Sequence, residues 1–196
     1  LREDPQALDL RTVPSAVGGD VKTRHGIITA KSIPAKKYGI QTGEPVMKAL
    51  QKCPDLILVP GDRKTYKEYS RQFIAILKKY AEVVEQVSID EAYMDMTGAA
   101  GSAGSRDEER KAVLEIAAGI RKEIRESLGF TVNVGISSNK LLAKMASDFQ
   151  KPDRTHTLFP DEVAGKMWPL PIRELHGCGG ATAARLNTLG IVTIGD

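Results

Sequence analysis

Two adjacent carboxylates, Asp90 and Glu91, stand between two apolar runs, and this pattern constrains the fold more than any other in the chain. The runs, residues 83–89 and 92–96, contain the β-branched, aromatic and other apolar side chains that are typical of strands. Neighbouring side chains on an uninterrupted strand point to opposite faces of a sheet, so the two acids could not serve one site there. At the tip of a tight hairpin this alternation is interrupted, so that two adjacent side chains can face the same ion. We therefore predict a β-hairpin with both carboxylates at its tip.

A pair of exposed carboxylates suits a magnesium ion. Mg²⁺ takes one or two protein carboxylates and completes its octahedron with water and phosphate oxygens. An Asp-Glu pair on its own is more often a solvated turn than a metal site. This pair stands within Ser-Ile-Asp-Glu-Ala-Tyr, residues 88–93, which is a much more restrictive sequence.

Composition limits the class of protein without identifying it. The 196 residues are 41% hydrophobic and 27% charged, which suits one sizeable domain or two small ones. The net charge of +3 is too small to indicate a nucleic-acid partner. Cys53 and Cys178 lack the spacing of zinc ligands, and we expect reduced thiols in a cytoplasmic protein. The sequence contains no apolar run of the length that a membrane span needs.

The spacing of apolar residues predicts alternating strands and helices. Besides the hairpin, short strands are expected at residues 13–17, 26–31, 56–59, 131–137 and 155–159. Helices are expected at residues 33–37, 42–53, 62–80, 107–127, 139–149 and 181–189. From residue 62 the order is helix, strand, strand, helix, strand, helix, strand. With one further strand before it, this order suits a ferredoxin-like sheet covered by helices on one face. The predicted fold class is α+β.

Two other segments carry features suited to phosphate. One helix face would carry Lys140, Lys144 and Lys151 if the helix extends that far. Lysines at this spacing more often form a solvent-exposed helix face than a binding site. Residues 175–180, Leu-His-Gly-Cys-Gly-Gly, precede a predicted helix. Glycine lets the backbone approach a ligand closely, and the first turn of a helix offers free N–H groups to an anion.

These segments resemble the Y family of DNA polymerases, the translesion enzymes, and within it the DNA polymerase IV and UmuC-like (ImpB/MucB/SamB) branch. The resemblance is carried by the hexapeptide at 88–93, by Val-Gly-Ile-Ser at 134–137 with Asn139-Lys140, by Lys151-Pro152, and by residues 175–180. It spans almost the whole chain. The family's opening strand, which carries another metal-binding aspartate, and its C-terminal little-finger domain are expected to be absent from these 196 residues.

The resemblance implies three parts: small α/β fingers at residues 1–60, a ferredoxin-like palm at 61–165 and a partial helix-hairpin-helix thumb at 166–196. It implies an enzyme that transfers deoxynucleotides from deoxynucleoside triphosphates to the 3′-hydroxyl of a primer on template DNA, with two Mg²⁺ ions. The fragment itself is expected to be nearly inactive. Any sliding-clamp contact would lie in the C-terminal part outside this chain.

The resemblance also assigns roles to acidic and basic residues. Asp90 and Glu91 are the expected metal ligands and catalytic residues, and Lys151 is expected to contact the incoming triphosphate. In the fingers, Lys36 is expected to contact phosphate as well. The chain departs from the family there, because Ile33 replaces a common tyrosine and Lys36 replaces an arginine. Ile33 cannot donate a hydrogen bond, and Lys36 lacks the bidentate guanidinium fork.

In the thumb, Gly177, Gly179 and Gly180 are expected to contact the phosphate backbone of DNA. Two other functions stay open: a non-catalytic DNA-binding module in which the thumb dominates, and a nucleotide-cyclase-like enzyme on the same sheet. The Gly-Gly-Asp at residues 18–20 is similar to part of the cyclase signature, but the strand-pair acids expected around it are missing. The fold by itself does not separate these functions.

Overall fold

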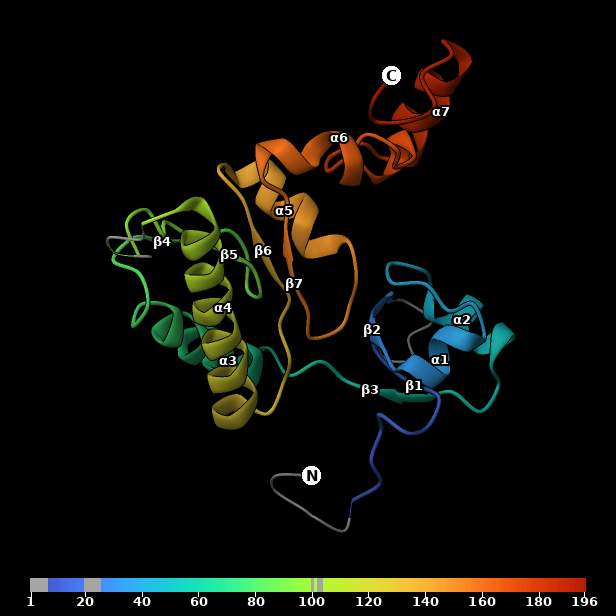
Figure 1. The fold of residues 1–196 in the computed structure, drawn as a ribbon. Helices are drawn as coiled ribbons and strands as arrows, with labels where there is room; N and C mark the ends of the chain where they lie inside the picture. The colour runs from blue at the N-terminus through green and yellow to red at the C-terminus, as the bar shows by residue number, and fades with distance from the viewer. Residues whose placement is uncertain (1–6, 20–25, 100, 102–103) are drawn as a thin grey trace. The chain divides into compact units, whose positions relative to one another are not determined.

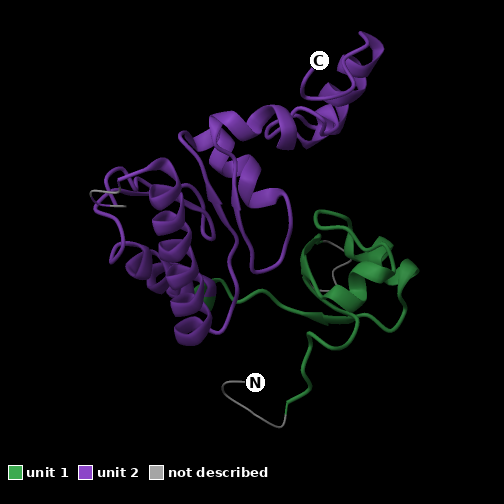
Figure 2. Ribbon diagram, viewed as in Figure 1, with its two compact units in different colours: residues 1–65 green, residues 66–196 purple. Residues whose placement is uncertain are grey.

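The computed structural model describes residues 7–19, 26–99, 101 and 104–196. The chain divides into two compact units, Leu1–Thr65 and Tyr66–Asp196 (Figure 2). Asp20, which belongs to the cyclase-like turn, and residues 100, 102 and 103, which follow the hairpin, lie outside the described residues. None of the described helices combines the length and the apolar character needed to cross a membrane.

Unit 1 is built on a three-stranded sheet in the order β2-β1-β3 (Figure 1). Strand β1 (Ser15–Gly18) lies in the centre, with β2 (Ile28–Lys31) antiparallel to it and β3 (Ile57–Val59) parallel to it. Helices α1 (Ile33–Lys37) and α2 (Val46–Lys52) contribute to the same core. The buried core residues of unit 1 are Ala16, Ile28, Ala35, Ile40, Val46, Ala49, Cys53 and Leu56.

Helices α3 (Arg63–Leu77) and α4 (Arg106–Leu128) pack together in unit 2 beside the hairpin strands β4 (Val84–Gln86) and β5 (Ala92–Met94) (Figure 1). Their apolar side chains recur every three to four residues, so each helix presents one apolar stripe to the other. The buried core residues that they share are Phe73, Ile76, Leu77, Ile120, Ile124 and Leu128.

The second half of unit 2 begins with β6 (Val134–Ile136), which pairs in parallel with β7 (Thr155–Thr157). Between them runs α5 (Lys140–Asp148). The chain ends with the 3₁₀ turn Pro160–Glu162, α6 (Val163–Lys166), a second 3₁₀ turn at Ile172–Glu174 and α7 (Gly180–Thr188). A third core joins α5 to these last elements through Met145, Ala146, Leu158 and Met167.

Local chemistry explains where several helices start and stop. Ser32, Ser105 and Asn139 have extended backbones, and their side-chain oxygens accept from the N–H three residues on, which caps α1, α4 and α5. Gly129 ends α4 with φ of +76°, a left-handed conformation that glycine adopts without steric cost. The predicted long helix at 107–127 is therefore confirmed.

Gly135 in β6 lets α5 lie directly on the strand. A Cβ atom at this position would be 1.9 Å from the carbonyl oxygen of Ala143 and 2.5 Å from the amide nitrogen of Ser147. Both atoms belong to the backbone of α5 and cannot rotate away. Only glycine fits this approach, which fixes the height of α5 above the sheet.

The strands of unit 2 form two separate two-stranded sheets, β4-β5 and β6-β7, in the described part of the chain. The sequence predicts them as strands of one ferredoxin-like sheet. A cavity of about 1560 Å³ is lined by residues of both sheets and of helices α3 and α4, including Phe73, Met94, Ile120 and Ile136. Asp90, Glu91 and Lys151 line this same cavity.

Candidate active site

The hairpin differs in detail from the prediction. The lead-in strand β4 ends at Gln86, and five residues, 87–91, connect it to β5. The amides of Val87 and Ser88 both donate to the carbonyl oxygen of Glu91, at 2.9 and 3.2 Å. This shared acceptor closes the loop and ends the regular ladder, so the alternation of side chains stops three residues earlier than expected. Asp90 and Glu91 are both exposed at the end of the loop.

Asp90 is held by a neighbour within the same loop. The hydroxyl of Ser88 donates to Oδ1 of Asp90 at 2.8 Å, and the amide of Asp90 donates back to that hydroxyl at 3.3 Å. The side-chain amide of Gln86 donates to the carbonyl oxygen of Ser88 at 2.9 Å and to the hydroxyl of Ser70 at 3.1 Å. Ser70 is buried on α3, so the loop that presents Asp90 is fastened to that helix.

Glu91 is paired with a lysine from α5. The ammonium of Lys144 lies 2.5 Å from Oε1 of Glu91 and 3.3 Å from Oδ2 of Asp148, one helical turn further along. Asp148 in turn lies 2.7 Å from the ammonium of Lys151. The result is a chain of alternating charges that runs from Lys151 through Asp148 and Lys144 to Glu91.

The protonation of this chain follows from its contacts. Burial opposes the charge on Lys144, but the hydrogen bond to Glu91 and the attraction of Asp148 leave the pKa of Lys144 above its ordinary value. Burial likewise raises the pKa of Asp148, while the hydrogen bond from Lys151 and the attraction of Lys144 lower it, and the net direction is down. Both groups are therefore charged at neutral pH.

A second lysine of α5 reaches the hairpin one turn earlier. Lys140 pairs with Glu85 of β4, and its ammonium lies 5.7 Å from the centre of the Tyr93 ring. Both charged side chains are well exposed, at 61% and 54%, so water screens the attraction. No hydrogen bond or ion pair joins Lys140 to Asp90 or Glu91.

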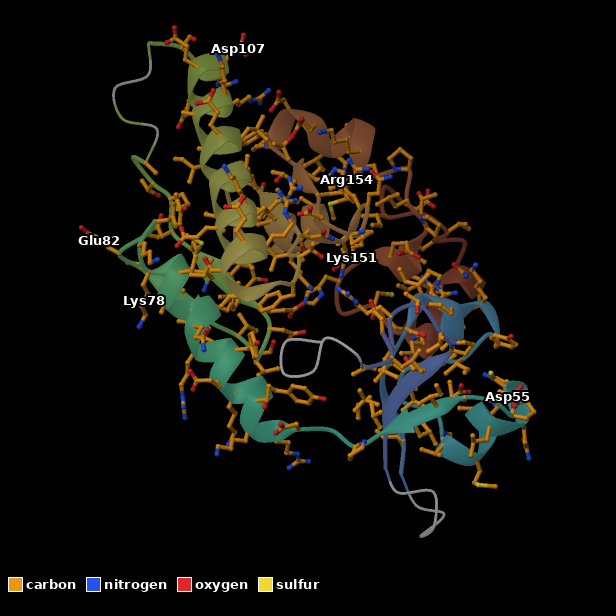
Figure 3. All side chains as sticks on the ribbon, turned by 90° about the horizontal axis from the view of Figure 1, so that it is seen from below. Asp55, Lys78, Glu82, Asp107, Lys151 and Arg154 are labelled. Atoms are coloured by element: carbon orange, nitrogen blue, oxygen red, sulfur yellow. The ribbon has the colours of Figure 1, made fainter. Side chains whose placement is uncertain are left out.

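The turn that carries Lys151 is held by two arginines of α4. Figure 3 labels Lys151 and Arg154 on the segment that joins α5 to β7. Asp153 between them has φ of +55°, and its carboxylate accepts from Arg121 at 2.9 Å and from Arg125 at 2.7 Å. The hydrogen bond from Arg121 holds the pKa of Asp153 below its ordinary value. These contacts fix the path of the chain beside Lys151.

Lys36 lies in unit 1, at the C-terminal end of α1, and is exposed. In the described residues of the chain, no acidic side chain forms an ion pair with it. A shallow cavity of about 360 Å³ is lined by Lys36, Lys31, Ile33 and Thr42, where the Lys31 ammonium donates to the Thr42 hydroxyl at 3.1 Å. A role for Lys36 in binding phosphate stays a prediction.

The three glycines at the start of α7 are exposed: Gly177 precedes the helix, Gly179 is its N-cap and Gly180 its first residue. Internal packing does not require them. Gly177 has φ of +86°, which favours glycine, but Gly179 and Gly180 do not need a left-handed backbone. A Cβ atom at any of the three would meet nothing within 4 Å among the described atoms. These glycines leave the start of α7 open to an external group, in contrast to Gly135.

The donor set at the hairpin fits magnesium bound together with phosphate. Among the described residues, no group of three or more histidine, cysteine or acidic side chains gathers to hold a metal by itself. Asp90 and Glu91 are each held at one carboxylate oxygen, and the other oxygen has no partner among the described residues. Two such exposed carboxylates are the protein share that Mg²⁺ usually takes, the remaining ligands being water and phosphate oxygens. Asp95, on the same hairpin, accepts from the Thr97 amide at 2.9 Å and belongs to a local turn.

Sequence reasoning missed several supporting residues. The hexapeptide pattern assigns no role to Ser88, and the spacing of lysines does not distinguish Lys144 from a surface lysine. The sequence does contain an indication of the role of Asp148, because this residue lies four positions after Lys144 and three before Lys151, which are the spacings of helical ion pairs. The hydrogen bonds from Arg121 and Arg125 to Asp153 join residues 28 to 32 positions apart, and no local sequence pattern indicates them.

Comparison with known proteins identifies the family. The family described as impB/mucB/samB matches residues 1–148, and the helix-hairpin-helix motif of the same family matches residues 160–191. A relative named DNA polymerase IV, from Clostridium acetobutylicum, is 47% identical over 189 residues, covering 96% of this chain and 46% of the relative.

Solved structures agree with the sequence relatives. The crystal structure of DinB from Sulfolobus solfataricus is 34% identical, with a TM-score of 0.83, and the match covers 98% of this chain and 53% of that one. A chimera titled Y-family DNA polymerase, Dbh-Dpo4(243-245)-Dbh, is 34% identical with a TM-score of 0.82, covering 92% of this chain and 52% of the chimera.

These matches confirm the predicted fold class, α+β with a helix-hairpin-helix segment, and the resemblance to Y-family polymerases. The chain spans about half the length of the relatives that it matches. Because the family match covers residues 1–148 of 196, the chain belongs to the impB/mucB/samB family.

Proposed function

We propose that the whole protein is a damage-tolerant DNA polymerase that adds deoxynucleotides to a primer 3′-hydroxyl on template DNA. Residues 1–60 are its fingers, 61–165 its palm and 166–196 part of its thumb. The observation that carries the proposal is the exposed pair Asp90 and Glu91, which lines one cavity with Lys151 in a chain whose relatives are named DNA polymerase IV. The unpaired thiols Cys53 and Cys178 are consistent with a cytoplasmic location.

In this proposal Asp90 and Glu91 are two of the protein ligands that would hold two magnesium ions. When bound, such ions stabilise the attacking and leaving oxygens of an in-line displacement at phosphorus. The protein's own share is positioning, because phosphoryl transfer needs little covalent chemistry from side chains. Ser88 supports this role, since its hydroxyl keeps one oxygen of Asp90 in place, while the other has no partner in the part of the chain that the structure describes.

Basic and backbone groups bind the phosphates of the substrates. The Lys151 ammonium donates hydrogen bonds to the triphosphate of the incoming nucleotide, for which it exchanges its contact with Asp148. Lys36 provides a second positive charge from the fingers. Gly177, Gly179 and Gly180 let a DNA phosphate approach the free amides at the start of α7, so binding there is independent of base sequence and sensitive to salt.

The test is primer extension by the whole protein with Asp90→Ala. We expect the rate to fall about a thousandfold, because the lost ligand removes several kcal/mol of charge stabilisation. Asp95→Ala is the matched control, since it removes a carboxylate from the same hairpin that serves only a local turn. The 196-residue chain alone is expected to extend a primer weakly at most. Full activity of Asp90→Ala would show that the site lies elsewhere.

The same samples separate the other two functions. A non-catalytic DNA-binding module would bind DNA without magnesium and would show no extension in the wild-type whole protein. A cyclase-like enzyme would form linear or cyclic dinucleotides from triphosphates without a primer. Extension that requires both a primer and magnesium, and is lost in Asp90→Ala, would exclude both.

A further inference from the structure

We propose that Lys144 is a positioning residue for the metal-binding carboxylate Glu91, and that Asp148 holds Lys144 in place for this task. The inference rests on the proposed function, because it assigns Glu91 to the metal site. It gives a role to a half-buried lysine that neither the sequence pattern nor the family match distinguishes from the other lysines of α5.

The contacts of Lys144 define the proposal. Its ammonium lies 2.5 Å from Oε1 of Glu91, 53 residues away in sequence, and leaves Oε2 of that carboxylate without a partner among the described residues. A carboxylate held at one oxygen can offer the other to a cation in a single orientation. Without the ammonium, Glu91 would sample several rotamers from a side chain that is 49% exposed.

Lys144 is itself fixed. Its side chain is only 17% exposed, whereas that of Lys140, one turn earlier on α5, is 61% exposed. Asp148 holds the same ammonium at 3.3 Å from the next turn of the helix. Gly135 keeps α5 at a set height on β6, so the reach of Lys144 to the hairpin is determined by packing.

An ammonium beside a metal ligand also repels a cation, and the charge balance decides which effect prevails. Lys144 and Lys151 carry two positive charges, and Glu91 and Asp148 carry two negative charges, so the group is neutral overall. Asp148 lies between the two lysines and offsets the field of the Lys144 ammonium at the hairpin. We therefore expect positioning to outweigh repulsion, as it does for other outer partners of metal ligands.

The first measurement does not depend on polymerase activity. In the 196-residue chain, three-bond NMR couplings that report χ1 of Glu91 should show one dominant rotamer. In Lys144→Met they should show rotamer averaging, and in Lys144→Arg one rotamer should again dominate. Lys140→Met is the matched control, because it removes an ion pair from the same helix to the same hairpin without touching Glu91. Unchanged Glu91 couplings in Lys144→Met would overturn the proposal.

The second measurement is the magnesium dependence of primer extension by the whole protein. Lys144→Met should raise the Mg²⁺ concentration for half-maximal rate about tenfold, with a smaller change in the KM for nucleotide. Lys144→Arg should restore most of the loss, and Lys140→Met should match the wild type. Equal melting temperatures of the variants exclude unfolding as the cause.

The outcomes separate the two proposals. If Lys144→Met loosens Glu91 but leaves the magnesium dependence unchanged, while Asp90→Ala abolishes extension, the ion pair is structural and the inference fails alone. If the magnesium requirement falls instead, Lys144 competes with the metal and the inference also fails. If the wild-type whole protein extends no primer, the proposed function fails. Mn²⁺-induced broadening of the Glu91 resonances, compared between wild type and Lys144→Met, then decides the inference.

Discussion

The packing of α5 on β6 leads to a specific prediction for Gly135→Ala. The added Cβ would stand 1.9 Å from the carbonyl oxygen of Ala143, whereas carbon and oxygen atoms in close contact are about 3.3 Å apart. Strand and helix would therefore have to separate by about 1.4 Å. The separation would loosen the buried Met145 and Ala146, which lie on the same helix.

The size of the effect follows from the nature of the obstructing atoms. Overpacking of a core commonly costs about 1–3 kcal/mol, and we expect about 3 kcal/mol here because backbone atoms cannot rotate away. For a chain of this size, that corresponds to a fall in the melting temperature of about 6–12 °C. The assay is thermal unfolding of the 196-residue chain followed by circular dichroism.

Gly119→Ala is the matched control for this prediction. Gly119 lies in the middle of α4, and a Cβ there would be 3.9 Å from the Tyr80 hydroxyl, which is an ordinary contact. Alanine is favoured over glycine in a helix by about 1 kcal/mol, so this variant should melt slightly higher than the wild type. A melting temperature of Gly135→Ala within about 1 °C of the wild type would refute the argument, since the expected shift is several times larger.

Three further predictions concern other parts of unit 2. Gly180→Ala should not lower thermal stability, because its Cβ meets nothing within 4 Å among the described atoms, and should weaken duplex DNA binding by the whole protein about tenfold in fluorescence anisotropy; unchanged affinity would count against the phosphate contact. Arg121→Met should lower the melting temperature near neutral pH, because the Arg121 contact lowers the pKa of Asp153 and so stabilises the folded state. The difference from wild type should shrink as the pH falls from the ordinary aspartate pKa of about 4 toward the lower pKa that Asp153 has in the folded state, and a constant difference would contradict this assignment. Ile124→Ala should lower the free energy of unfolding, measured by urea denaturation, by about 2–5 kcal/mol, because Ile124 is fully buried between α3 and α4. A decrease below about 1 kcal/mol would show that the core rearranges to fill the space left by the side chain.

Local patterns in the sequence predicted most of the secondary structure. The apolar stripes of α3 and α4 depend on residues three or four positions apart. All the residues that form such a pattern lie in one continuous stretch of the chain, so the pattern can be recognised from the sequence. The hairpin was also predicted from its two apolar runs, although its first strand ends at Gln86. That residue's side chain bonds to Ser70 on α3, a contact that the hairpin sequence by itself does not indicate.

Local patterns along the chain specify most of the helices and strands, place the acidic pair on a hairpin and, through the motifs, indicate the family. Which charges meet depends on how distant elements pack, because Glu91 and Lys144 lie 53 residues apart and are joined by packing. It likewise distinguished Gly135, which packing requires, from Gly179 and Gly180, which packing does not. A helix or a turn is set by the energies of neighbouring residues. An ion pair between distant elements is set by the height and angle at which those elements pack.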